Sequence, residues 1–451
     1  MPALTAELGR FASALALEDI PPEAQAVAKT GIADCFGVMI AGARDPVVAL
    51  LDREMAGSDN TAQASLIPSL KKRNVEDAAL VNGAAAHVLD YDDVTLDGHP
   101  SAVLVPAIIA QGEMVGASGA ELLTAYVAGY EVWVELLVRE SVPLHQKGWH
   151  PTAVRGPVAA AAACARLRRL SPEKTQTALA IAASMAGGLV ANFGSLTKCF
   201  QVGRAAQSGV IAARLADAGL TASPDALEHQ SGYLAAYSPT GQAKLAEPFD
   251  RQKKVWHLAR QGLNVKRYPI CYATHRAIDA ALELTQMHDL KPADVDQIHV
   301  STGEMQMLMV RNHRPKNAFE AKFSMEFAMA SALVARSVGL AQLTDGFVGH
   351  PDVQGLIQRV AIETTKETMN GSAFAPSEKV TIRTKNGAMF GSEPIVHAKG
   401  SMQRPLSRSE LQVKFDDCIG EDLSAKSRID AFEKLMNLER LNGAADLLSL
   451  Q

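Results

Sequence analysis

The chain contains few cysteines and few aromatic residues. Its 5 cysteines are scattered over 451 residues and form no CxxC pair. This pattern argues against a disulfide framework, a structural zinc site and a cysteine-ligated iron–sulfur cluster. It is typical of a protein of the reducing cytoplasm.

Long hydrophobic runs are also missing. A membrane-spanning helix needs about 18 or more apolar residues in a row, and no segment of this sequence provides them. The N-terminal residues include acidic side chains before any long apolar run, which is not typical of a secretory signal. We therefore expect a cytoplasmic protein with no membrane partner.

Several familiar binding and catalytic motifs are absent. The sequence has no G-x-G-x-x-G after a strand, no Walker P-loop, no G-x-S-x-G elbow, no HExxH and no EF-hand loop. These absences argue against nucleotide binding, an α/β-hydrolase and the common metal sites. The net charge of −5 argues against nucleic acid as a partner, although local basic groups could still bind a small anion.

Composition and periodicity predict a mainly α protein of two domains. A chain of 451 residues with 47% hydrophobic residues is too long for one ordinary core. Apolar residues recur at helical spacing, and alanine is abundant, over residues 1–265. We expect a large all-helical domain there, completed by residues 400–451, where helical spacing returns.

Residues 266–399 are predicted to form a smaller, inserted α+β domain. Residues 297–302 and 379–384 alternate like strands, and Asn386-Gly387 is a strong hairpin signal. Residues 319–338 and 353–364 have helical spacing. This mixture is expected of an α+β unit.

The densest group of polar residues lies between two small, apolar helical segments. Within thirteen positions the chain gathers His87, Asp90, Asp92, Asp93, Thr95, Asp97 and His99. Buried carboxylates and imidazoles cost stability unless they are paired or used, so we interpret the stretch as one wall of an active site. Two alternatives remain open, namely a metal site and a structural role in which Asp90 and Asp93 cap a helix end and a turn.

Three further segments carry candidate groups. His150 lies in GWHPT and is a candidate functional residue; the alternative is a structural histidine held by hydrogen bonds. Lys198, in SLTKCF, could be a partly buried acid, base or anion-binding group, or a solvated surface lysine. The segment KRYP begins at Lys266 and is followed by Cys271 and His275, which suggests an anion site before a helix or a charged domain junction.

Taken together, these segments resemble the MmgE/PrpD family. The resemblance is carried, in the family's order, by NGAAAHVLDYDD, GHPSAVLVPA, GWHPTAVRGPVAAAAA, GSLTKCFQVGRAAQSGV, KRYPICYATHRAIDAALEL and EAKFSMEFAMASAL. The family includes 2-methylcitrate dehydratase, cis-aconitate decarboxylase and iminodisuccinate epimerase. The resemblance implies a homodimer with a large all-helical domain and a smaller α+β lid domain, and no metal or organic cofactor.

The resemblance also implies the site residues. The catalytic candidates, each matched to a family motif, are Asp90, His99, His150, Lys198 and Lys266. The substrate-binding candidates are Asp93, Thr95, Thr197, Arg267, Cys271 and His275.

Some positions depart from the family pattern. Cys271 stands where the decarboxylase has a histidine, and Gln201 replaces the histidine of a frequent T-K-x-x-H-x-G motif. Val94 stands where many members have threonine, and the loop to His99 is shorter than in the decarboxylase. These departures argue against cis-aconitate decarboxylation.

We therefore expect a cofactor-independent lyase or isomerase that moves a proton next to a carboxylate of a small di- or tricarboxylate. The activity would be epimerase-like, on an iminodisuccinate-type substrate, or dehydratase-like, on a 2-methylcitrate-type substrate. The alternatives are cis-aconitate decarboxylase-like activity and a non-catalytic polycarboxylate-binding protein.

Such chemistry needs cations for the carboxylates and two acid/base groups. We assign Lys198 and Lys266 to the substrate carboxylates, with one of them a possible proton donor. His99 and His150 are the candidate base and acid, and Asp90 is expected to orient an imidazole.

Overall fold

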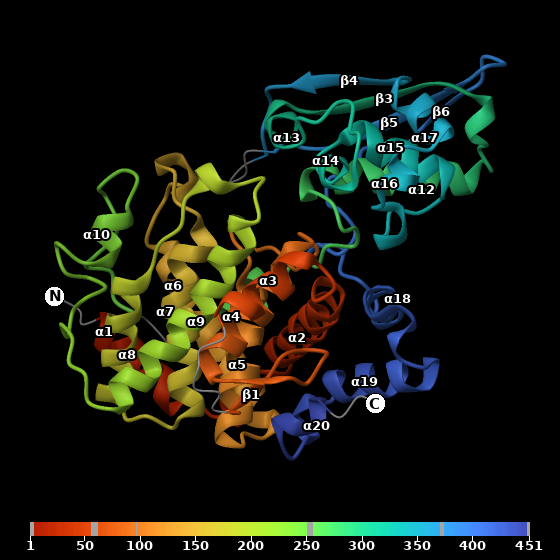
Figure 1. Ribbon diagram of the computed structural model, residues 1–451. Coiled ribbons are helices and arrows are strands. Elements are labelled where there is room, and N and C mark those ends of the chain that lie inside the picture. The colour runs from red at the N-terminus through yellow and green to blue at the C-terminus, as the bar shows by residue number, and fades with distance from the viewer. Residues whose placement is uncertain (1–3, 56–61, 96, 250–255, 370–373, 449–451) are drawn as a thin grey trace. The chain divides into compact units, whose positions relative to one another are not determined.

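The computed structural model describes residues 4–55, 62–95, 97–249, 256–369 and 374–448. The chain divides into two compact units, Met1–Asn264 with Arg408–Gln451, and Val265–Ser407. The first unit is helical apart from one short β-ribbon, and the second combines helices with a four-stranded sheet (Figure 1). The predicted fold class, mainly α with a smaller α+β unit, is confirmed.

Proline and small residues shape the first unit. Helices α2, α5, α7 and α8 each have a proline in the first turn. Proline has no backbone N–H, and at this position no hydrogen bond is lost, because the N–H groups of the first turn have no acceptor within the helix. A two-stranded antiparallel ribbon, β1 (Ala64–Ser65) and β2 (Lys72–Arg73), accompanies the helices. The helices of the first unit are α1 (Leu4–Ala14), α2 (Pro22–Gly42), α3 (Pro46–Met55), α4 (Val75–Val88), α5 (Pro100–Val115), α6 (Gly119–Val138), α7 (Pro151–Leu167), α8 (Pro172–Met185), α9 (Thr197–Asp217), α10 (Tyr233–Tyr237), α11 (His257–Gln261), α18 (Arg408–Ile419), α19 (Ala425–Met436) and α20 (Ala444–Leu448).

Two glycines let α4 and α9 pack backbone to backbone. A Cβ on Gly83 would lie 2.8 Å from the Cα of Gly203, and a Cβ on Gly203 would lie 2.2 Å from the backbone oxygen of Leu80. Any larger residue at either position would force the helices apart. This crossing lets the end of α4 and the start of α9 present side chains to the same place.

The C-terminal segment belongs to the first unit. Helix α18 packs on α2, which is itself buried over most of its second half. The second unit ends at Ser407, whereas the sequence predicted its end at residue 399.

The second unit is a four-stranded sheet with helices on one face (Figure 1). The strand order is β4-β3-β5-β6, in which β3 and β4 are parallel and the other pairs antiparallel. Buried positions alternate along β5, as expected of a sheet that covers a core on one side. The elements are α12 (His275–Met287), β3 (Val295–Gly303), α13 (Glu304–Met309), α14 (Ala318–Ala321), α15 (Met325–Val334), α16 (Asp345–Val348), α17 (Pro351–Ile357), β4 (Val360–Thr365), β5 (Lys379–Thr384) and β6 (Met389–Gly391).

Two predicted helices are corrected by the structure. The helix expected over 353–364 ends at Ile357, and Val360–Thr365 is instead a strand paired with β3. Periodicity alone does not distinguish a helix from a strand in a short apolar run. The β-branched residues of this segment favour a strand. The helix expected over 319–338 is two helices, the second of which begins after Ser324, whose side chain accepts a hydrogen bond from the Phe327 N–H.

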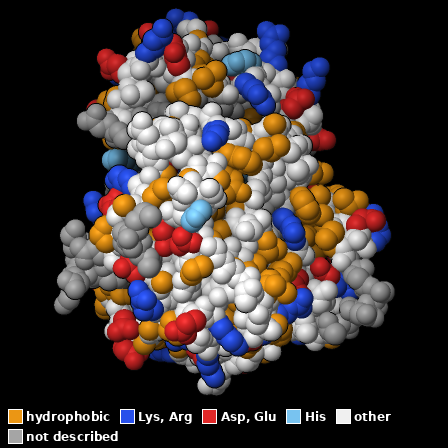
Figure 2. All heavy atoms as spheres, turned by 90° about the vertical axis from the view of Figure 1, so that its left-hand side faces the viewer, with side chains coloured by type: hydrophobic (Ala, Val, Ile, Leu, Met, Phe, Trp, Pro, Cys, Tyr) orange, Lys and Arg blue, Asp and Glu red, His pale blue; other side chains and the backbone are white. Residues whose placement is uncertain are grey.

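The surface and the helix lengths bear on possible partners. On the face drawn in Figure 2, acidic and basic side chains are interspersed, with no continuous basic stripe among the coloured atoms. Among the helices that the structure describes, no single one has the length and apolar character to cross a membrane, and only α2 and α3 taken together, bent by 88°, meet those criteria.

Candidate functional site

The loop between α4 and α5 carries the acidic residues and folds back on itself. Asp90 follows α4 with a positive φ of 54°, which turns the chain sharply at the end of the helix. Thr95 and Gly98 exchange two backbone hydrogen bonds, and a Cβ on Gly98 would lie 2.6 Å from Cζ2 of Trp133. The tight turn therefore needs glycine, and it returns the chain to His99 at the start of α5.

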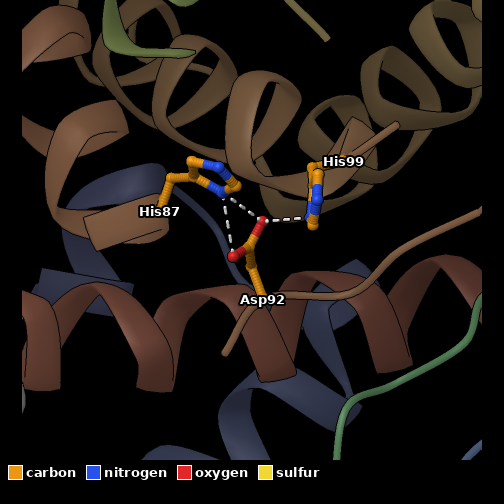
Figure 3. Close-up of side chains that lie close together, drawn as sticks. All are labelled: His87, Asp92 and His99. Atoms are coloured by element: carbon orange, nitrogen blue, oxygen red, sulfur yellow. Dashed lines mark hydrogen bonds and ion pairs between the residues drawn. The ribbon is translucent and has the colours of Figure 1, made fainter. Parts of the chain in front are cut away.

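Asp92 is hydrogen bonded to two imidazoles. Its carboxylate oxygens lie 3.0 and 2.9 Å from His87 Nδ1, and Oδ2 lies 2.9 Å from His99 Nδ1. The two rings approach the carboxylate from different sides, with their centroids 4.6 Å apart (Figure 3). We call these three residues the His–Asp–His cluster. His99 Nδ1 also lies 2.9 Å from the backbone oxygen of Asp93.

Burial and mutual contact decide the charges in this cluster. Burial alone would raise the pKa of Asp92, but the His87 and His99 imidazoles outweigh it and hold this pKa well below its usual range. Burial lowers the pKa of His87 to about 4. At neutral pH the cluster therefore contains a carboxylate and a neutral His87, and the protons on the two Nδ1 atoms face Asp92.

The cluster contains three atoms of the kind that ligate metals. One ligand atom each from His87, Asp92 and His99 lies within 4.8 Å of the others. The Nδ1 atoms, however, are in direct hydrogen-bond contact with the carboxylate, so that an ion there would have to displace both protons and separate the groups. The geometry fits a hydrogen-bonded cluster better than a metal centre.

His150 stands at the start of α7 and is held by Gln201 of α9. His150 Nδ1 lies 2.6 Å from Gln201 Oε1, while the amide nitrogen of Gln201 donates to the backbone oxygen of Leu189 over 3.2 Å. This pairing assigns the ring proton to Nδ1 and leaves Nε2 as an acceptor. Burial lowers the pKa of His150 well below its ordinary value, with the nearby His87 adding to the effect. The rings of His150 and His87 are 6.3 Å apart.

Lys198 and Asp90 form an ion pair where α9 begins and α4 ends. Lys198 Nζ lies 2.9 Å from Asp90 Oδ1, and it sits 5.4 Å from the ring centroid of Phe193. Because α9 begins at Thr197, Lys198 is on its first turn. Asp92 contacts the imidazoles of His87 and His99, and the role expected of Asp90, to orient an imidazole, stays a prediction.

The predicted substrate-binding residues of the first unit differ in their exposure. Asp93 is buried, accepts a hydrogen bond from Ser101 Oγ, and has its pKa raised well above the usual value by burial. Ser101 Oγ in turn lies 2.7 Å from the hydroxyl of Tyr126. Thr95 is buried in the tight turn, whereas Thr197 is exposed.

The remaining predicted residues belong to the second unit and are described within it. Lys266 is buried. Exposed Arg267 lies 3.6 Å from Asp279, which also accepts a hydrogen bond from the hydroxyl of Tyr268 over 2.7 Å. His275 begins α12 with Nε2 3.2 Å from the backbone oxygen of Ile270.

A backbone contact also fixes the segment before α12. The backbone N–H of Cys271 donates to the backbone oxygen of Lys322 over 2.9 Å. The predicted roles of Lys266, Arg267, Cys271 and His275 stay predictions.

Sequence reasoning missed three residues of this site. His87 and Asp92 lie in the acidic stretch but were not among the predicted site residues, and Gln201 was noted only as a departure from a motif. The available signal was the presence of two further ionisable residues, His87 and Asp92, between Asn82 and His99. Spacing along the chain did not show which carboxylate would face which ring, because the loop after α4 changes direction at Asp90.

Comparisons with known proteins match nearly the whole chain. The family model of the MmgE/PrpD N-terminal domain matches residues 6–246, and that of the MmgE/PrpD C-terminal domain matches residues 268–438. The cis-aconitate decarboxylase of Mus musculus is 31% identical over 384 residues, which cover 80% of this chain and 76% of that protein. The cis-aconitate decarboxylase of Homo sapiens is 30% identical over 388 residues, covering 83% and 78%. That of Aspergillus terreus (strain NIH 2624 / FGSC A1156) is 26% identical over 474 residues, covering 99% and 95%.

Proposed function

Because the chain belongs to the MmgE/PrpD family and is a lyase-type enzyme of that family, we propose that it moves a proton next to a carboxylate of a small tricarboxylate. The observation that carries the proposal is the His–Asp–His cluster. It holds His99 in a fixed orientation and places a negative charge where an imidazolium needs one.

The relatives suggest the first substrate to test. Three that resemble the chain over most of its length are named cis-aconitate decarboxylases. cis-Aconitate carries three carboxylates, and we assign Lys198, whose charge acts on His87 of the cluster, to one of them. Its ion pair with Asp90 keeps the ammonium in place until an anionic substrate competes for it.

The decarboxylation can be written with the site's groups. The vinylic carbon of cis-aconitate accepts one proton, the bond to the carboxylate on the methylene carbon breaks, and its electron pair forms the new C=C bond. The products are CO2 and methylenesuccinate, so one proton is consumed. We assign the proton to Nε2 of His99, because Asp92 stabilises the positive charge that His99 carries before the transfer.

His150 is proposed as the second acid/base group. It is neutral at neutral pH, and Gln201 fixes its Nδ1–H, so that Nε2 can accept a proton or a hydrogen bond. Lys266 is proposed to act on a substrate carboxylate.

A second candidate is proton exchange without loss of CO2, as in a dehydratase or an epimerase. These reactions remove a proton and use a second group to protonate a leaving hydroxyl or the opposite face of the carbon. The observation that favours this candidate is that two imidazoles, His99 and His150, are each oriented by a partner of their own. The departures at Gln201 and Cys271 favour it as well.

Proton NMR of the purified protein in D2O separates the candidates. With cis-aconitate, decarboxylation gives the exo-methylene signals of methylenesuccinate together with released CO2. With 2-methylcitrate-type substrates, a dehydratase converts the methyl doublet into the singlet of a methyl group on the new double bond, without CO2. With iminodisuccinate-type substrates, an epimerase exchanges the α-proton without forming an alkene.

Two controls complete the experiment. The variants His99→Asn and His150→Asn are expected to lower turnover by at least about 100-fold, within the range typical for loss of an acid/base group. Saturable binding of these polycarboxylates with no turnover of any of them would replace the proposal by the non-catalytic binding protein.

A further inference from the structure

We propose that His87 is a positioning residue for His99: by donating a second hydrogen bond to Asp92, it shares the charge of that carboxylate and so sets how tightly His99 holds its proton. The inference rests on the proposed role of His99, and it concerns a residue that makes its contact to Asp92 rather than to the substrate.

The first argument is the geometry of the shared carboxylate. His87 Nδ1 is close to both oxygens of Asp92, at 3.0 and 2.9 Å. His99 Nδ1 is close to one of them, Oδ2, at 2.9 Å, and also to the backbone oxygen of Asp93, at 2.9 Å. Figure 3 shows that the two rings reach the carboxylate from different sides. A carboxylate that accepts from two donors offers less charge to each of them than one that accepts from a single donor.

The second argument is that His87 can donate only through Nδ1. The opposite nitrogen, Nε2, is buried and makes no hydrogen bond to any residue that the structure describes. A buried N–H without an acceptor is costly, so the proton stays on Nδ1, where Asp92 accepts it. Only 2% of His87 is exposed, and its lowered pKa keeps it neutral over the pH range in which enzymes are assayed.

The third argument is the contrast between the two imidazoles. The side chain of His99 is 13% exposed and that of His87 1%, so His99 is the ring that a substrate can reach. His87 therefore acts on His99 indirectly, through the carboxylate of Asp92. Without it, Asp92 would concentrate its charge on His99, and the His99–Asp92 pair would keep its proton to a higher pH.

Other ionisable groups surround the cluster and have to remain unchanged in a test. Lys198 of α9, His145 and His150 influence the electrostatics of the imidazoles, and the buried pair of Asp34 and Lys414 lies beside Asp92. Arg155 of α7 pairs with Asp97 of the same loop. A comparison of two substitutions at residue 87 leaves all of these groups in place.

The experiment compares His87→Asn with His87→Leu. The side-chain amide of asparagine can donate from nearly the position of Nδ1, whereas leucine fills the space without a donor. His257→Leu is the matched control, because His257 also pairs with a carboxylate, that of Glu135, at 2.8 Å, but belongs to another part of the first unit. Thermal unfolding of each variant establishes that it is folded.

The primary readout is the titration of His99, followed by NMR of protein labelled at histidine Cε1 and assigned with His99→Asn. We expect the His99 signal to titrate about one pH unit higher in His87→Leu, as for the removal of one neighbouring donor. It should move by less than about 0.3 units in His87→Asn and His257→Leu. This readout needs no turnover, so it can succeed even when the proposed reaction is wrong.

The pH–rate profile is the second readout. The limb that depends on His99 should move to higher pH in His87→Leu by about the same amount, with a larger change in kcat than in KM. Unchanged titration of His99 in a folded His87→Leu protein would overturn the proposal. Equal shifts in the leucine and asparagine variants would overturn it too, because the donor would then not be the cause.

Discussion

Lys414 Nζ lies 2.5 Å from Asp34 Oδ1, and both side chains are buried in the first unit. The same ammonium group donates a hydrogen bond to the backbone oxygen of Tyr91 over 2.9 Å and lies 4.1 Å from the centroid of that ring. Tyr91 immediately precedes Asp92. A helix from the C-terminal segment, α18, thus anchors the loop that carries the His–Asp–His cluster.

Replacing Lys414 by methionine should destabilise the protein. The substitution leaves Asp34 buried without its cation and removes the anchor of Tyr91, and breaking a buried pair costs about 3–5 kcal/mol. Chemical denaturation measures the change. The double variant Asp34→Asn, Lys414→Met is the control and should recover part of the loss. A Lys414→Met protein as stable as the parent would show that the pair contributes little.

The Asp34 carboxyl predicts a pH dependence of stability. Burial raises the pKa of Asp34 to about 6, although Lys414 opposes the effect. A carboxyl whose pKa is higher in the folded protein than the unfolded value of about 4 stabilises the fold at low pH, and this contribution is lost as the pH rises from about 4 to about 6.

The matched variant for this pH dependence is Asp34→Asn. Its stability relative to the parent should increase over that interval by on the order of 2 kcal/mol and stay level above it. Denaturant titrations at several pH values test this, and a difference that is constant from pH 4 to 7 would contradict it.

Lys198 is expected to bind a substrate carboxylate. Lys198→Met should raise KM for the tricarboxylate about tenfold or more, because one charge-assisted contact is lost, while Lys198→Arg should retain part of the binding. Lys174→Met is the control, since Lys174 forms an exposed ion pair with Asp217. Steady-state kinetics with the substrate found by NMR decides the matter. Equal KM values for Lys198→Met and Lys174→Met would remove Lys198 from the binding site.

Gln201 is expected to set the orientation and proton affinity of His150. Gln201→Leu leaves Nδ1 of His150 without its acceptor and should lower kcat by about 10- to 100-fold with little change in KM. Gln201→Glu keeps an acceptor and adds a negative charge, so the limb of the pH–rate profile that depends on His150 should move to higher pH. A profile unchanged in both variants would show that His150 does not take part in the proton transfer.

Lys266 is the candidate from the second unit with the clearest test. Lys266→Met should lower kcat/KM by at least about 100-fold if its ammonium group acts on a substrate carboxylate. Lys291→Met is the control from the same unit and should have a smaller effect, because Lys291 forms an exposed ion pair with Asp289. If Lys266→Met folds normally and keeps full turnover, the predicted role is wrong.

Local features of the sequence are sufficient to predict the helical first unit and the segments in which the site lies. Apolar spacing and prolines in the first turns define helices such as α5 and α7 locally, so a reading of the chain places His99 and His150 at their starts. Local signals also identify β5 and its hairpin turn. They fail for β4, because the strand becomes distinct from a helix only when it pairs with β3, about 60 residues away.

The contacts between charged groups could not be predicted from local sequence, because they depend on how the helices pack. Asp90, with its positive φ, turns the loop, and Asp92 faces both imidazoles. The close crossing of α4 and α9 at Gly83 and Gly203 brings Lys198 to Asp90, residues 108 positions apart. Lys414 reaches Tyr91 across 323 positions. Periodicity describes one helix at a time, whereas these contacts depend on which helices pack together and how closely their backbones approach.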